Sequence, residues 1–148
     1  MKNKFIANII LCKSITKDKE FNEVFNSIVI EEEPDDVNFD VGIFLTSDIK
    51  ETTSKILLVN ILHEKGEGNV EIFPIATLKR TFDEHKKDID LLVLKARKIQ
   101  FKNDGLYEVE VRICEDTEED LNEIETIKKL YDNSELINSF AFSAYIKK

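Results

Sequence analysis

The feature that most constrains the fold of this chain is a two-residue rhythm of apolar side chains between residues 105 and 114. Tyrosine, valine, valine and isoleucine occupy every second position from 107 to 113, and charged residues stand between them. Because successive side chains of a strand point to opposite faces, this rhythm predicts a strand with one face in a core and the other toward water. The inward set is Tyr107, Val109, Val111 and Ile113.

Similar alternation, or a short continuous apolar run, recurs along the rest of the chain at short and regular intervals. Such runs predict strands, and the polar stretches between them predict turns. This spacing favours an antiparallel β-sandwich over a parallel sheet with crossover helices. The expected strands, about eight in number, are residues 5–12, 24–30, 37–46, 56–62, 70–75, 91–101, 105–113 and 140–146.

Two segments show helical spacing. The segment 76–88 is ambiguous, but Leu78, Phe82 and His85 fall at helical spacing, so it predicts a short surface helix or a helical turn between two strands. Thr117 and Asp120 resemble a capping box, which predicts the start of an amphipathic helix of roughly 14 residues that is inserted before the last strand and caps an open end of the sandwich. Its apolar stripe is Leu121, Ile124, Lys128 and Tyr131.

The length of the chain fits one domain. A domain of 148 residues buries about 68 to 70% of the surface that its unfolded chain exposes. No repeat, linker or low-complexity tract divides the sequence, so residues 1–148 are expected to form a single sandwich domain. Cys12 and Cys114 are too few for a secreted disulfide framework. Both lie in apolar runs, which predicts buried free thiols, with a bridge between them as the alternative.

The N-terminus has some features of a signal peptide, because Lys2 and Lys4 precede an apolar run. That run is short, contains Asn8, and is followed by Lys13 instead of a small-residue cleavage site. No other segment approaches the roughly 20 apolar residues of a membrane span. The expectation is a cytoplasmic protein that does not associate with membranes.

Acidic residues outnumber basic ones, which gives a formal net charge of −9 at pH 7. Nucleic acids and anionic membranes are bound by clustered Lys and Arg, so this balance argues against both as direct partners. The carboxylates gather in two clusters, residues 31–36 and 115–125. A solvated surface explains such clusters most simply, and negative charge near a helix N-terminus also stabilises the helix.

The second acidic cluster allows three functional interpretations. The first is contact with a protein partner. The second is calcium at the end of a C2-like sandwich, although such sites use several loop aspartates and glutamate predominates here. The third is mimicry of nucleic acid, as in acidic inhibitors from phages and mobile elements that block a basic host protein. The candidate partner-binding residues are Glu118, Glu119, Asp120 and Glu123.

Patterns for catalysis and metal binding are weak. His63 and His85 have acidic neighbours, but the chain has neither the two-histidine helical spacing nor the cysteine pair of a zinc site. No serine lies in a glycine-flanked elbow. Gly66 and Gly68 lack the further glycine and lysine of a phosphate loop. We therefore expect no catalysis, no cofactor and no bound metal.

The turn before the central strand carries a family likeness. Asn103, Gly105 and Tyr107 resemble the tyrosine corner of immunoglobulin-like sandwiches, in which a tyrosine hydroxyl bonds to the backbone just upstream. The resemblance covers residues 101–109 and implies a structural role for these three residues. An antibody-type domain is excluded, because Val109 stands where such a domain has its cysteine and the chain has no Trp. The sandwich type stays open between immunoglobulin-like and C2-like.

More loosely, the chain resembles single-domain bacterial β-sandwich proteins that begin with an apolar strand bearing an Ala-Asn pair, here Ala7 and Asn8. This likeness transfers no active site. The expected function is a non-catalytic module that binds a protein partner through a sheet edge or through loops at the end of the sandwich. The nucleic-acid mimic is the alternative.

Overall fold

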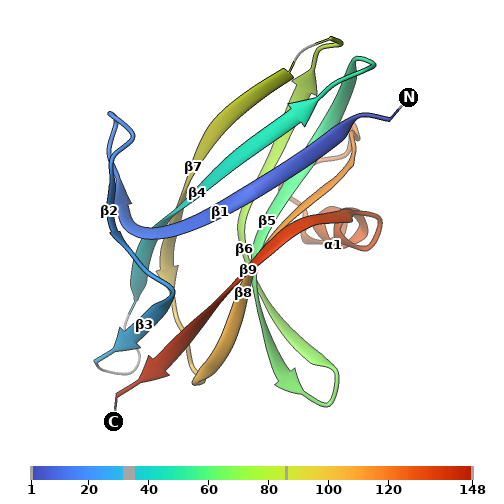
Figure 1. Ribbon diagram of the computed structural model, residues 1–148. Helices are drawn as coiled ribbons and strands as arrows, with labels where there is room; N and C mark the ends of the chain where they lie inside the picture. Colours follow the sequence, from blue (N-terminus) through green and yellow to red (C-terminus); the bar gives the residue numbers. More distant parts are fainter. Residues whose placement is uncertain (1, 32–35, 86, 148) are drawn as a thin grey trace.

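The computed structural model describes residues 2–31, 36–85 and 87–147, and these form two packed β-sheets and one helix (Figure 1). The β-sandwich predicted from the sequence is confirmed. The described strands number nine, against the eight expected. They are β1 (Lys4–Ile15), β2 (Phe21–Val24), β3 (Ser27–Ile30), β4 (Val37–Asp48), β5 (Thr53–Gly66), β6 (Asn69–Phe82), β7 (Lys87–Ile99), β8 (Gly105–Glu115) and β9 (Glu135–Ile146), and the helix is α1 (Ile124–Asp132).

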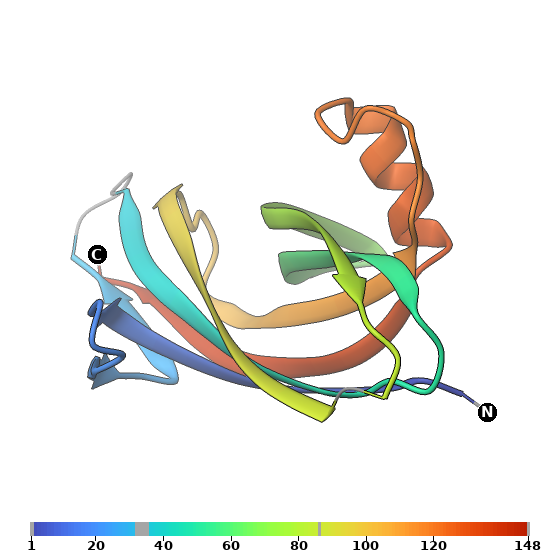
Figure 2. The ribbon, with the colours of Figure 1, turned by 90° about the horizontal axis from the view of Figure 1, so that it is seen from above.

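The strands divide into a four-stranded sheet in the order β2-β1-β4-β7 and a five-stranded sheet in the order β3-β9-β8-β5-β6. Each described pair of neighbours is antiparallel except β3 and β9, which run parallel. The expectation of a purely antiparallel sandwich is therefore wrong at this pair. Seen from above, α1 lies at the side of β8 and the β5–β6 hairpin, on the opposite side of the molecule from β2 (Figure 2).

The expected single strand 24–30 is two strands, because the chain changes sheets inside it. β2 pairs with β1 in the four-stranded sheet, and β3 pairs with β9 in the five-stranded one. At the change, the amide of Phe25 donates to the carbonyl of Leu11 at 2.9 Å, and the amide of Ser143 donates to the carbonyl of Asn26 at 3.0 Å. The apolar pattern of this stretch is compatible with either sheet, so the sequence could not reveal the change.

The core lies between the two sheets. The four inward residues predicted on β8 are all buried, and Tyr107 and Val109 are completely so. Tyr107 packs against the rings of Phe101 and Phe142, with centroids 4.8 and 5.7 Å away. The two-residue rhythm therefore identified the inner face of this strand correctly.

The helix predicted for 76–88 is wrong. β6 continues to Phe82 and β7 begins at Lys87. A four-residue spacing places two side chains on one face of a strand as well as of a helix, so Leu78 and Phe82 both face the core. In β7 the side chains of Ala96 and Ile99 belong to the core, and those of Leu92 and Leu94 pack against it.

The helix α1 starts later and is shorter than expected, with nine residues. The capping box predicted at Thr117 and Asp120 is wrong, because both side chains bond inside the connection before the helix. The Thr117 hydroxyl accepts from the amide of Glu119 at 3.2 Å, and Asp120 Oδ1 accepts from the amide of Asn122 at 2.9 Å. Glu123 occupies the N-cap position without a side-chain cap hydrogen bond.

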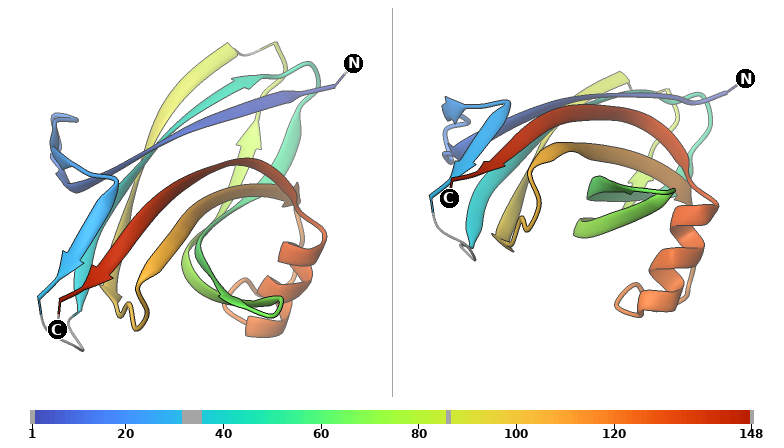
Figure 3. Two further views of the ribbon diagram at one scale, coloured as in Figure 1. Left: turned by 60° about the horizontal axis from the view of Figure 1, so that its bottom comes forward. Right: turned by 90° about the horizontal axis from the view of Figure 1, so that it is seen from below.

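The helix packs on the outer face of the five-stranded sheet and not across an open end of the sandwich. Leu130 closes a small apolar cluster with Ile56 and Leu58 of β5 and Cys114 of β8. Figure 3 shows α1 beside the β5–β6 hairpin in both views. No helix in the described part of the chain has the length and apolar character needed to cross a lipid bilayer.

Candidate functional site

A buried polar group holds α1 against β8. Glu110 was expected to face water, but α1 covers it and it is 6% exposed. Arg112 Nε and the Tyr131 hydroxyl both donate to Glu110 Oε1 at 3.0 Å. The Arg112 guanidinium also lies over the Tyr131 ring, 4.6 Å from its centroid. Because a buried carboxylate is costly without partners, these contacts position the helix.

The same contacts shift the pKa values of the two donors. Burial by itself would lower the pKa of Arg112, but the hydrogen bond and charge of Glu110 raise it above its ordinary value. Burial, reinforced by the hydrogen bond and charge of Glu110, raises the pKa of Tyr131. Arg112 is therefore cationic and Tyr131 is neutral at physiological pH, which is the state that both hydrogen bonds require.

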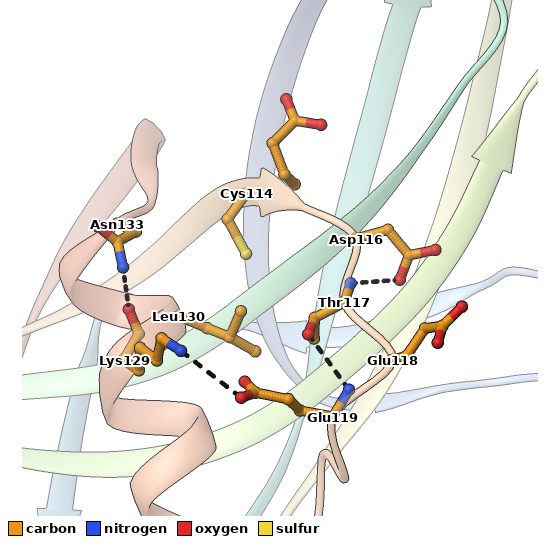
Figure 4. Close-up of a pocket in the computed structure, with 9 residues that line it drawn as sticks. Cys114, Asp116, Thr117, Glu118, Glu119, Lys129, Leu130 and Asn133 are labelled. Carbon is orange, nitrogen blue, oxygen red and sulfur yellow. Dashed lines mark hydrogen bonds and ion pairs between the residues drawn. The ribbon is translucent and has the colours of Figure 1, made fainter.

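An acidic hollow of about 550 Å³ lies between α1 and the segment that follows β8 (Figure 4). Cys114 and Leu130 supply its apolar part. Four carboxylates of the connecting segment also line it, and Lys129 of the helix points toward Glu119 (Figure 4). The carboxylates are those of Glu115, Asp116, Glu118 and Glu119.

Three of these four carboxylates are paired with nearby lysines. Lys55 pairs with Glu115, Lys79 Nζ with Asp116 Oδ1 at 3.0 Å, and Lys129 Nζ with Glu119 Oε1 at 3.5 Å. Lys79 also donates to the carbonyl of Thr117 at 2.7 Å and so fastens the segment to β6. Such exposed pairs contribute about 0 to 1 kcal/mol each. Their main effect is to order the connection.

The four candidate partner-binding residues are all exposed, but they do not share a helical face. Glu118, Glu119 and Asp120 precede the helix, and Glu123 stands at its N-cap. Within the described residues, Glu118, Asp120 and Glu123 pair with no cation. These three are the free carboxylates among the four candidates.

On the other side of α1 lies an apolar groove of about 460 Å³, which sequence reasoning missed. Asn60 of β5 lines it and is 3% exposed. The signal was present in the sequence, because Asn60 is the one polar residue in the apolar run 56–62. The other residues that line the groove are Ile72, Pro74, Ile124, Ile127, Lys128, Tyr131 and Asp132.

Hydrogen bonds and ring stacking hold the turn formed by Asn103, Gly105 and Tyr107. The Tyr107 hydroxyl donates to the carbonyl of Asn103 at 2.7 Å, which is the contact that the sequence pattern predicts. Gly105 has a φ of 134°, a conformation that side-chain-bearing residues rarely adopt. His63 stacks on the Tyr107 ring at 4.2 Å, and its Nδ1 donates to the carbonyl of Leu106 at 3.0 Å. Burial raises the pKa of Tyr107, so the hydroxyl keeps its proton.

A second buried carboxylate lies in the four-stranded sheet. Asp40, 1% exposed, accepts from the amide of Ile15 at 2.7 Å, from Lys95 Nζ at 2.8 Å and from Arg97 Nη2 at 3.0 Å. Burial by itself would raise the pKa of Asp40, but these donors hold it below its ordinary value. All the oxygens are engaged inside the protein, so this group is structural.

The remaining candidates do not converge on one another. His85 is exposed in the turn before β7. Cys12 and Cys114 are buried free thiols, and burial raises the pKa of both. Across residues 2–31, 36–85 and 87–147, no group of three or more His, Cys, Asp or Glu side chains is placed to hold a metal ion. Most of the first acidic cluster, 31–36, lies outside the described residues.

The chain was also compared with known proteins. It matches no protein-family model, and no curated protein is similar to it. The geometry around α1 therefore carries the functional argument.

Proposed function

We propose that this protein is a non-catalytic module that binds another protein through the segment 115–132. The observation that carries the proposal is the set of free carboxylates at Glu118, Asp120 and Glu123, the last of which directly precedes the 71% exposed Ile124 in the chain. Protein interfaces combine an apolar centre with a polar, solvent-accessible rim. A partner surface with basic side chains around an apolar contact would match this arrangement.

The rigidity of the segment supports this function. Glu110, Arg112 and Tyr131 hold α1 on the sheet, and Lys79 fastens the connection to β6. A surface that is ordered before binding loses less conformational entropy when the complex forms. The buried free thiols suit a reducing compartment, and we propose that the module acts in the cytoplasm.

We also propose that the sandwich is of the immunoglobulin-like type and not of the C2-like type. Its sheet order supports this assignment. In immunoglobulin-like sandwiches, strands A, B and E lie side by side in one sheet, and strands C, F and G lie side by side in the other. Here β1, β4 and β7 are neighbours in that way in one sheet, and β5, β8 and β9 in the other. Tyr107 lies near the start of β8, the strand that corresponds to F.

Mimicry of nucleic acid is the second candidate, and the free carboxylates favour it as well. A mimic needs a row of unneutralised charges, because its target normally binds phosphates. Here Glu115, Asp116 and Glu119 are paired with lysines, which interrupts that row. We therefore place the mimic second.

The test is an affinity pull-down from cells that express the protein, followed by binding measurements with each purified partner. One variant reverses the charge of Glu118, Glu119 and Glu123 to lysine. A control variant reverses three exposed glutamates elsewhere, Glu20, Glu51 and Glu108, and so has the same net charge.

We expect a discrete partner that binds the wild type and the control, and whose affinity falls at least tenfold for the first variant. Equal binding by both variants would exclude the segment as the contact surface. The mimic would be favoured if the partner also binds DNA or RNA, if the nucleic acid competes with this protein for the partner, and if the affinity of this protein for the partner falls steeply with salt.

A further inference from the structure

A largely buried carboxamide lines the apolar groove between α1 and β6. Asn60 is 3% exposed, no hydrogen bond between described residues involves its side chain, and its carboxamide is not among the fully enclosed polar atoms, so it is reached through the groove. Buried polar side chains nearly always have one. A carboxamide that lacks a partner and lines a groove is therefore available to a ligand.

The neighbours of Asn60 explain why it is unpaired. Its neighbour on β6 is Pro74, whose side chain has no hydrogen-bonding group. Its partner on β8 is Glu110, whose Oε1 already accepts from Arg112 and Tyr131. A β-bulge between Val59 and Asn60 further disturbs the pairing with β6 at this point. Within the described residues, the side chains on either side of Asn60 thus make no hydrogen bond with its carboxamide.

The groove has the volume and the apolar lining that are typical of small-molecule sites. Ligand pockets in proteins have volumes of about 300 to 1,000 Å³, apolar walls and a few polar groups that orient the ligand. This groove has a volume of about 460 Å³, with Ile72, Ile124 and Ile127 among its walls. Ile72 and Ile124 are 44% and 71% exposed, so covering them would remove apolar surface from water.

The polar groups of the groove indicate the chemistry of the ligand. Lys128 and Asp132 carry opposite charges, so the groove selects no ionic group. The Asn60 carboxamide offers one acceptor and one donor side by side. A neutral amide presents the complementary donor and acceptor. A peptide strand added to β6 is disfavoured, because Pro74 interrupts the donors that such pairing needs.

We propose that this groove binds a small, mainly apolar molecule that carries a neutral amide, and that Asn60 pairs with this amide. The groove shares Ile124 with the proposed protein contact, but the argument from Asn60 does not depend on the protein-binding function. Benzamide is a suitable probe, since it joins an apolar ring to a primary amide. Acetophenone is its matched control, because it keeps the ring and the carbonyl but has no N–H to donate.

The test follows the backbone amide resonances of the ¹⁵N-labelled protein by NMR during titration with each compound. We expect saturable shifts for residues around the groove and a preference for benzamide of about five- to tenfold, the ratio that one hydrogen bond supplies. In Asn60→Leu, which keeps the side-chain size, the preference should disappear. In Asn8→Leu, an exposed asparagine of β1 in the other sheet, it should persist.

An additional measurement on the wild type keeps the test independent of how well the variant folds. Nuclear Overhauser effects between the benzamide N–H protons and the Asn60 side chain should be observed. The proposal is overturned if neither compound produces saturable shifts, if the shifts lie away from the groove, or if Asn60→Leu retains the preference for benzamide.

Discussion

The buried carboxylate of Asp40 gives the sharpest prediction about stability. Replacement by alanine removes the acceptor of three hydrogen bonds. The amide of Ile15 then stays buried without a partner, which costs about 1 to 3 kcal/mol. Lys95 and Arg97 have side chains that are 52% and 45% exposed, so water can solvate them again, and their loss adds about 1 kcal/mol. The expected loss in free energy of unfolding is about 2 to 4 kcal/mol.

The isosteric variant Asp40→Asn separates the charge from the shape. It keeps an acceptor for Ile15 and loses only the ionic part, so we expect a smaller loss of about 1 to 2 kcal/mol. Glu23→Ala is the control, because the Lys13–Glu23 pair is 3.6 Å long and both side chains are 73% exposed. Such a pair should change the free energy of unfolding by close to zero.

The effect of Asp40 should also depend on pH. The folded protein holds the pKa of Asp40 below its value in the unfolded chain, which is about 3.9. Its contribution to stability is therefore complete above the unfolded pKa and is lost as the pH falls through the folded pKa. The stability difference between wild type and Asp40→Asn should stay constant above about pH 5 and shrink below about pH 4.

Urea unfolding followed by circular dichroism measures these differences, provided that the slope with denaturant is the same for all variants. The reasoning would be refuted if Asp40→Ala unfolded at the same urea concentration as Glu23→Ala. A difference between wild type and Asp40→Asn that grows at acidic pH would show that the donors do not stabilise the charged form.

Three further predictions concern the tyrosines and the thiols. Tyr107→Phe removes only the hydroxyl that donates to Asn103 and should lower the free energy of unfolding by about 1 kcal/mol; an unchanged urea midpoint would contradict this. Tyr131→Phe leaves Glu110 with Arg112 as its side-chain donor and should cost about 1 to 2 kcal/mol, and faster cleavage by protease near α1 would locate the effect. The two cysteine thiols should react slowly with Ellman's reagent in the folded protein, where burial raises their pKa, and both should titrate in denaturant without reductant.

The sequence was informative wherever a pattern depends on near neighbours along the chain. The inner face of β8 followed from alternation, because a strand's side chains alternate whatever the strand packs against. The hydrogen bond from Tyr107 to Asn103 spans only four residues, so a local motif could predict it. The α1 segment was recognised as helical, although its start was misplaced because Thr117 and Asp120 serve turns instead of a cap.

Errors arose where a local pattern was compatible with two structures. The stretch 24–30 reads as one strand, but pairing with β1 and then with β9 divides it between the sheets. The spacing of Leu78 and Phe82 suits a helix and a strand equally, and pairing with β5 over residues 53–66 selects the strand. In both cases the pairing with strands distant in sequence decided between the two structures, and a local sequence pattern does not reveal such pairing.

By itself, the sequence determined that this chain is mainly β, acidic, and filled by aliphatic and phenylalanine side chains, because those properties depend on composition and on short-range periodicity. The tertiary structure alone decided which polar residues are enclosed. Glu110 and Asn60 occupy outward positions of neighbouring strands, and only the docking of α1 turns that face from a wet surface into a covered one. The hydrogen-bonding capacity of a side chain is local, but whether a partner satisfies it depends on strands and a helix that are distant in sequence.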